Sequence, residues 1–306
     1  MNLDPLRRAL AARGLSSAST IADSSGGRVE EASIQLARLV EGSRLKSLPV
    51  STGHSHPEPL AFLDGIQRSE VVAYAGASPI LVAEIAAAVR ERRGRQLHTV
   101  LEERRGLALA RPAALARAGA VLDGLDLVPL PDDEVPHPVR DLVQAARALD
   151  RTRGTLELAV GDRYRTRSDA WLVVDGALSE SPRWSADDRM VAVSKSHSIL
   201  PFDGDDLERY LRIPPGYRSS VYQPRTRSLA PVCAWGLRLW PWEGKDLLHG
   251  LVRVEVSPRN GTSETADAIS QWLLAERAPL SLPDRRWDRL LYGIYSVEQY
   301  LRSKTA

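Results

Sequence analysis

Two segments of the sequence place an aspartate and a glycine directly after a short apolar run. Residues 60–65 read Leu-Ala-Phe-Leu-Asp-Gly, and residues 171–176 read Trp-Leu-Val-Val-Asp-Gly. Each run is typical of a strand buried on both faces, and each delivers a carboxylate at its end, Asp64 or Asp175. If the two strands are neighbours, the carboxylates lie close together, which is unfavourable unless a cation lies between them. Mg²⁺ and Mn²⁺ both accept such oxygen ligands.

The same dipeptide also has a plainer interpretation. Asp-Gly is one of the commonest turn signals, because glycine lets the backbone turn sharply after a strand. Either segment taken singly predicts a turn more readily than a site. Two matched segments in one chain favour the metal hypothesis.

Glu157 is the candidate for a third carboxylate. It lies eighteen residues before Asp175, on a helix predicted over residues 139–166. Its position at the margin of the apolar face is one where glutamate is usually solvated. Glu102 and Glu103 are rivals, but their arginine-rich surroundings predict a surface cluster of salt bridges instead.

Lys195 is the candidate for a cationic group beside these carboxylates. Only four of the 41 basic residues are lysines, so a lysine at the end of an apolar run stands out. Such a lysine either extends its charged end to solvent or faces a phosphate and offsets the charge that develops during attack.

Composition limits the class of protein. The chain has 306 residues, 43% hydrophobic and 26% charged, which is ordinary for a globular protein with a sizeable core. The net charge is +2, so positive charge for binding nucleic acid must be concentrated locally. Cys233 is the only cysteine, which excludes an internal disulfide and a multi-cysteine zinc site and suits a cytoplasmic protein. We expect neither a secretory signal nor a membrane span.

Hydrophobic periodicity predicts a mixed α/β sheet flanked by helices, with a helical N-terminal extension. Strands are predicted at 60–65, 71–74, 80–89 (where a helix remains possible), 170–175, 189–194, 230–239 and 251–256. Helices are predicted at 6–10, 29–40, 112–122, 139–166, 262–277 and 286–302.

These motifs together resemble the NurA family of nucleases. The resemblance rests on residues 63–65, 153–158, 171–178, 191–195 and 251–256 and spans roughly residues 60–303. It implies an RNase H-like fold in which Asp64, Glu157 and Asp175 bind two divalent cations, Mn²⁺ or Mg²⁺, and Lys195 stabilises the transition state. The family places a metal-site histidine near its C-terminus. Here Glu298 stands about where that histidine is expected, and His197 is an alternative.

The resemblance also implies partners and a domain arrangement. NurA nucleases process DNA ends as homodimers together with a HerA-type hexameric ATPase that translocates DNA. Residues 46–306 would form the nuclease domain and residues 1–45 an extension for dimerisation or docking. The arginine-rich residues 217–227, with two tyrosines among them, either track a DNA strand or form an ordinary solvated loop.

Two other functions remain open. A catalytically weak relative would serve as a DNA-binding or docking subunit of a translocase, which the missing C-terminal histidine favours. A His-x-His metal hydrolase is suggested by His54 and His56, although their polar, proline-containing surroundings resemble a loop rather than a strand end. The joint presence of Asp64, Glu157, Asp175 and Lys195 favours the nuclease over both.

Overall fold

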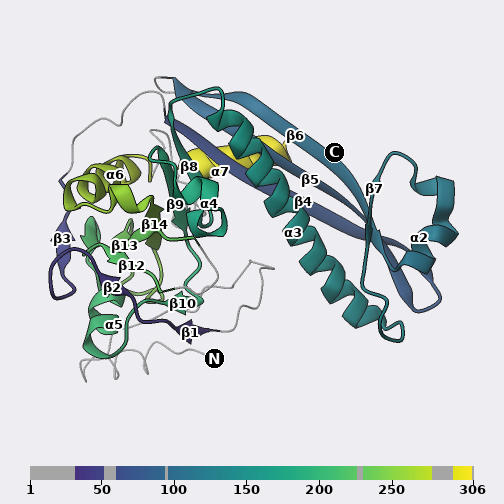
Figure 1. Ribbon diagram of the computed structural model, residues 1–306, viewed down its shortest axis with the longest axis horizontal. Coiled ribbons are helices and arrows are strands. Elements are labelled where there is room, and N and C mark those ends of the chain that lie inside the picture. The colour runs from purple at the N-terminus through teal and green to yellow at the C-terminus, as the bar shows by residue number, and fades with distance from the viewer. Residues whose placement is uncertain (1–31, 52–59, 94–95, 226–229, 278–291, 305–306) are drawn as a thin grey trace. The chain divides into compact units, whose positions relative to one another are not determined.

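The computed structural model describes residues 32–51, 60–93, 96–225, 230–277 and 292–304. The chain divides into two compact units. Unit 1 contains the described residues of Met1–Pro57 and Trp171–Tyr292, and unit 2 those of Glu58–Ala170 and Gly293–Ala306 (Figure 1). Asp175 and Lys195 therefore belong to unit 1, and Asp64, Glu157 and Glu298 to unit 2.

Unit 2 is built on a sheet of three long strands and one short one. The antiparallel strands are β4 (Leu60–Ala75), β5 (Ser78–Arg93) and β6 (Gln96–Ala110), and β7 (Asp126–Pro129) pairs in parallel with β6. Gly76, with φ of 64°, makes the tight turn between β4 and β5 in a conformation that favours glycine.

A long helix covers one face of this sheet. Helix α3 (Pro138–Arg165) begins with proline in its first turn, where the missing N–H costs no hydrogen bond. It buries Leu149, Leu156 and Val160 and packs on β4, β5 and β6 (Figure 1). The remaining helical elements of this unit are α2 (Pro112–Ala118), η1 (Gly119–Leu122) and α7 (Tyr292–Arg302).

Unit 1 contains strands of mixed direction. Its strands, in spatial order, are β2 (Arg38–Leu39), β12 (Tyr222–Gln223), β13 (Cys233–Arg238), β14 (Leu251–Val256), β9 (Met190–Ser194) and β8 (Trp171–Asp175). β11 (Tyr217–Ser219) joins β13 to β3 (Ser47–Pro49), and β1 (Ser33–Ile34) pairs with β10 (Ile199–Leu200). β8 and β9 are parallel, which sets their C-terminal ends at one edge.

Alternation along β13 directs side chains to two separate cores of unit 1. Trp235 faces helix α6 (Ser263–Ala275), where its Nε1 donates to Ser270 at 2.9 Å. Gly236 points to the other face, where the ring of Tyr210 on helix α5 (Gly204–Leu211) fills the space of a side chain. The short helical elements of the unit are η2 (Leu178–Glu180), α4 (Pro182–Ser185) and η3 (Pro258–Asn260).

Most predicted elements are confirmed. The alanine-rich 80–89 segment is part of strand β5, and the strands at 170–175, 189–194, 230–239 and 251–256 and the helices at 112–122, 139–166 and 262–277 are present within a few residues of the predicted bounds. For 286–302 the described part is helix α7. None of the described helices has the length and apolarity needed to cross a membrane.

Two predictions are wrong. Residues 32–40 of the second predicted helix instead form β1 and β2, because their backbone pairs with β10 and β12. The predicted helix at 6–10 and residues 29–31 lie outside the described residues. Strand 60–65 does not end in a turn at Gly65, since β4 continues to Ala75 and includes the separate strand predicted at 71–74.

Candidate active site

Gly65 and Glu157 approach each other closely in unit 2. A methyl group added to Gly65 would lie 2.8 Å from Cγ and 2.9 Å from Cδ of Glu157, closer than real contacts allow. The glutamate side chain therefore lies directly on the backbone of β4, reached from helix α3. Glycine is required here for this close approach and not for a turn.

Asp64 precedes this contact point and is buried, with 8% of its surface exposed. Its Oδ1 accepts the N–H of Gly65 at 2.8 Å. Asp64 and Glu157 thus flank a single glycine, one on the strand and the other above it. Glu157 thus packs on the residue that follows Asp64, and a shared metal site for the two carboxylates stays a prediction.

Arg153 supplies positive charge to this pair. It forms an ion pair with Glu157, one helical turn away, and its Nε donates to Gln67 at 3.3 Å. Burial lowers the pKa of Arg153, but the negative charges of Glu157, Asp64 and Asp150 outweigh it and raise the pKa overall. The guanidinium therefore occupies surroundings that favour a cation. Sequence reasoning missed Arg153, although its i,i+4 spacing from Glu157 was visible.

Asp175 and Lys195 form a second pair of candidate residues, in unit 1. Asp175 is the last residue of β8 and pairs with Val193 of β9, after which Gly176 adopts φ of 120° and ends the strand. Lys195 follows β9 directly, and its Nζ lies 4.0 Å from Oδ2 of Asp175. The parallel pairing of β8 and β9 sets both residues at the C-terminal ends of these strands.

The other acidic candidates have partners of their own. Glu298 on α7 binds Arg302 at 2.8 Å, and its role as a metal ligand stays a prediction. Glu102 binds Arg104 and Glu103 binds Arg105, both at 2.7 Å, so the predicted salt-bridge cluster is confirmed.

The side chain of His197, the alternative to Glu298, is hydrogen-bonded to the backbone of unit 1. Its Nε2 lies 3.0 Å from the carbonyl oxygen of Leu251, a contact in which the ring nitrogen must donate. Burial lowers the pKa of His197 to about 4, against a smaller opposing effect of this hydrogen bond. His197 is therefore neutral at physiological pH, with one nitrogen already occupied. His54 and His56 lie outside the described residues.

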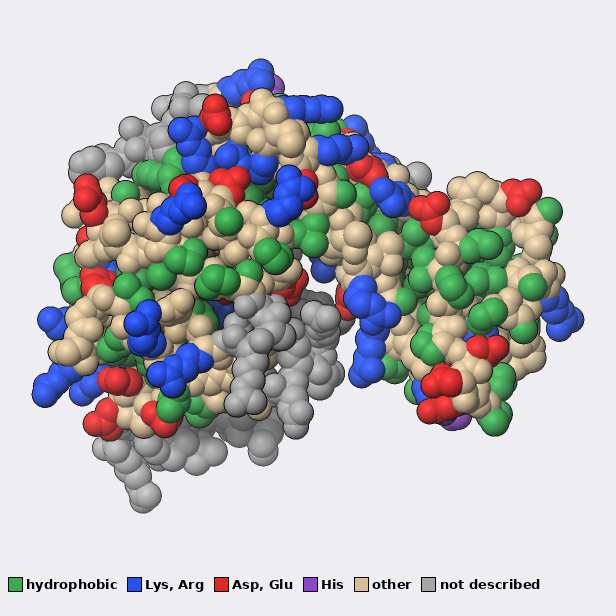
Figure 2. Space-filling view, in the orientation of Figure 1, with side chains coloured by type: hydrophobic (Ala, Val, Ile, Leu, Met, Phe, Trp, Pro, Cys, Tyr) green, Lys and Arg blue, Asp and Glu red, His purple; other side chains and the backbone are tan. Residues whose placement is uncertain are grey.

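Two of the residues that suggested a DNA-tracking loop in the arginine-rich segment are buried. Arg218 on β11 is fully buried and forms ion pairs with Glu41 at 2.7 Å and Asp267 at 2.5 Å. Tyr222 is also fully buried. Neither side chain is available to a nucleic acid. Basic and acidic side chains are interspersed on the face shown in Figure 2.

The carboxylates fit a divalent cation by their chemistry, because hard oxygen donors suit Mg²⁺ and Mn²⁺. Within the described parts of the chain, however, no three His, Cys, Asp or Glu side chains are grouped so that they could hold a metal ion. Unit 2 offers the pair Asp64 and Glu157, and unit 1 offers Asp175.

The fold is an RNase H-like α/β fold, as predicted from the sequence. It is similar to the crystal structure of the NurA nuclease from Sulfolobus solfataricus, with a TM-score of 0.52 over 83% of this chain and 82% of that one. Sequence identity is 12%, so the likeness defines the fold alone. The catalytic domain of human Endonuclease V aligns over 80% of this chain and 82% of that one with 14% identity. Its TM-score of 0.31 is too low to indicate a shared fold. No protein-family model and no curated protein matches the sequence.

Proposed function

We propose that this protein is a divalent-metal-dependent deoxyribonuclease that hydrolyses phosphodiester bonds. The observation that carries the proposal is the packing of Glu157 onto Gly65 beside buried Asp64, within a fold shared with a NurA nuclease. If Asp64 and Gly65 only formed a turn, no glutamate would need to pack on the glycine. The approach of Glu157 therefore favours a site over a turn. Asp175 and Lys195, at the C-terminal ends of β8 and β9, would supply the remaining groups.

Asp64, Glu157 and Asp175 would hold the cations, Mn²⁺ or Mg²⁺. Bound cations of this kind supply an acidified water and stabilise the leaving oxygen. Lys195, with 55% of its side chain exposed, is free to reach a substrate phosphate and offset charge that develops in the transition state. The proposal requires that the Asp64–Glu157 pair and the Asp175–Lys195 pair act on one phosphodiester.

The biological setting is part of the same proposal. By analogy with NurA, we infer a cytoplasmic protein that acts as a homodimer on DNA ends with a HerA-type translocase, in repair or defence. Residues 1–45 are proposed to serve dimerisation or docking. Co-purification with a hexameric ATPase of this type and the mass of the free protein in solution would test both partners.

The experiment for the activity uses the purified full chain with labelled single- and double-stranded DNA. Degradation is expected with Mn²⁺ or Mg²⁺ and none with EDTA. Asp64→Ala should abolish it while leaving the thermal transition in place. Metal-dependent degradation that survives Asp64→Ala unchanged would contradict the proposal, since it would come from another site or a contaminant.

A second candidate is a DNA-binding or docking subunit with weak activity. The ion pair of Arg153 with Glu157 favours it, because a permanent internal cation would replace the metal. This candidate predicts DNA binding without degradation under every metal condition. It also predicts that Asp64→Ala leaves DNA affinity unchanged.

A further inference from the structure

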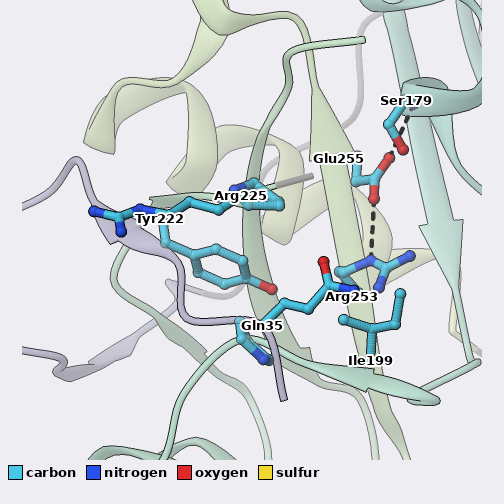
Figure 3. A pocket seen from close by; sticks show the side chains of 9 residues that line it. Gln35, Ser179, Ile199, Tyr222, Arg225, Arg253 and Glu255 are labelled. Carbon is cyan, nitrogen blue, oxygen red and sulfur yellow. Dashed lines mark hydrogen bonds and ion pairs between the residues drawn. The ribbon is translucent and has the colours of Figure 1, made fainter. Parts of the chain in front are cut away.

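Glu255 on β14 is a buried carboxylate that the proposed chemistry does not use. Only 2% of its surface is exposed. Its Oε1 lies 3.0 Å from Nε of Arg253, and its Oε2 accepts the backbone N–H of Ser179 at 3.3 Å (Figure 3). Burying an ionised carboxylate is costly unless it is paired and hydrogen-bonded. The Glu255 carboxylate thus has two partners inside unit 1, the side chain of Arg253 and a backbone amide.

That amide belongs to the segment that follows Asp175. Ser179 lies four residues beyond Asp175, in η2, and its carbonyl accepts the N–H of Ala230 at 2.9 Å. At the other end of the segment, the N–H of Gly176 donates to the carbonyl of Val193 at 3.2 Å. The backbone segment that follows Asp175 is therefore held by hydrogen bonds at both ends.

The sheet register explains how a side chain on β14 reaches η2. Glu255 pairs with Ala192 of β9, and Ala192 pairs with Val174 of β8, the residue before Asp175. Residues in one such row point to the same face. The small side chain of Ala192 leaves room for Glu255 to extend across β9.

We infer that Glu255 is a positioning residue for Asp175. By holding the amide of Ser179, it sets the direction of the backbone after β8 and so the place of the Asp175 carboxylate. A ligand carboxylate must be held closely, since small displacements at a reacting centre cost large factors in rate. The effect on activity rests on the proposed nuclease function, but the effect on the segment does not.

Glu255→Gln is a mild test of this role. The carboxylate borders a cavity of about 60 Å³ that Gln35, Ile199 and Tyr222 also line (Figure 3). Glutamine at position 255 has room to turn its amide away from Ser179. The substitution thus weakens the hydrogen bond without overpacking the core.

Glu41→Gln is the matched control. Glu41 is a carboxylate of the same unit with 19% of its side chain exposed. Like Glu255, it pairs with an arginine and accepts a backbone amide, that of Val221 at 2.9 Å. It has no contact with η2 among its hydrogen bonds to Arg218, Ser263 and Val221 in the described structure. Both variants should lose some stability for the same reason.

Two readouts separate positioning from simple stability. In Glu255→Gln, hydrogen exchange of the amides at 176–180 should accelerate at least tenfold. With DNA and Mn²⁺, kcat should fall at least tenfold and the half-saturating Mn²⁺ concentration should rise severalfold, with KM for DNA little changed. Glu41→Gln should match wild type in all of these measurements.

Unchanged exchange at 176–180 in Glu255→Gln would overturn the positioning role, whatever the activity. Equal changes in both variants, in proportion to their lower melting temperatures, would also overturn it. If the wild-type chain shows no metal-dependent degradation, the proposed function fails instead, and the exchange comparison still decides whether Glu255 holds the segment after Asp175.

Discussion

The carboxylate group of Glu157 lies so close to Gly65 that any side chain at position 65 would have to displace it. The contact joins helix α3 to strand β4 and places Glu157 on the residue that follows Asp64. Because Gly65 has no side chain, the strand can accept the glutamate without interrupting its pairing with β5. This relationship provides the most specific tests of the proposed site.

Gly65→Ala should reduce activity far more than stability. The added methyl must displace the flexible end of Glu157, and a displacement of about 1 Å at a catalytic centre costs about 100-fold in rate. We expect metal-dependent DNA degradation to fall by roughly that factor, with the melting temperature within a few degrees of wild type.

Gly154→Ala is the control for this change. Gly154 lies on the same helix, and a methyl group there meets open space. The variant should keep full activity and gain about 1 kcal/mol of stability, since alanine favours helix over glycine. If Gly65→Ala is as active as Gly154→Ala, Glu157 has no role in the chemistry.

Arg153→Gln should make the site bind metal more tightly. The guanidinium of Arg153 forms an ion pair with Glu157 and interacts electrostatically with Asp64. A metal ion must therefore compete with Arg153 for these carboxylates. Removing this internal cation should lower the half-saturating Mn²⁺ concentration severalfold. Arg151→Gln, on the exposed side of the same helix, should leave it unchanged. A rise in the Mn²⁺ requirement would mean that Arg153 supports the ligands and does not compete with the metal.

His197 should make the protein sensitive to mild acid. Burial lowers its pKa in the folded state to about 4, below the unfolded value of about 6.5. The unfolded state therefore binds the proton more readily, and stability is complete above pH 6.5 and falls as the pH drops towards 4. Between pH 7.5 and pH 5 this histidine should cost about 2 kcal/mol in the free energy of unfolding. Urea titrations of His197→Gln should show a loss smaller by that amount; an identical loss in both proteins would contradict this assignment.

Arg238→Met should destabilise unit 1 severely. Arg238 is fully buried, and burial lowers its pKa to about 10. Its guanidinium donates to backbone carbonyls, namely those of Leu211, Ile213, Leu247 and His249. Leaving such buried acceptors unpaired costs about 1–3 kcal/mol each, so a loss of at least about 3 kcal/mol is expected. Thermal unfolding of Arg209→Met, at an exposed surface ion pair, should barely differ from wild type.

The sequence was sufficient to predict the elements whose pattern is local. The apolar runs at β8 and β9, the amphipathic pattern of α3 and the fold class all followed from periodicity. The position of Lys195 at the end of a strand also followed, whereas its proximity to Asp175 depends on the parallel pairing of β8 and β9.

Features that depend on distant partners were not predictable in this way. Residues 32–40 have a helical pattern but form strands, because β10 and β12 offer their backbone hydrogen bonds. Arg218 and Tyr222 look like DNA-binding residues in a polar segment, yet ion pairs and aromatic packing bury them. Gly65 was interpreted as a turn residue because nothing local shows that Glu157 occupies its side-chain space.

The most direct test of the central claim is a crystal of the full chain soaked in Mn²⁺ and measured at a wavelength where manganese scatters anomalously. Anomalous peaks are expected next to carboxylate oxygens of both Asp64 and Asp175, with Glu157 beside them. Manganese bound away from these residues, or at only one of the two aspartates, would contradict it.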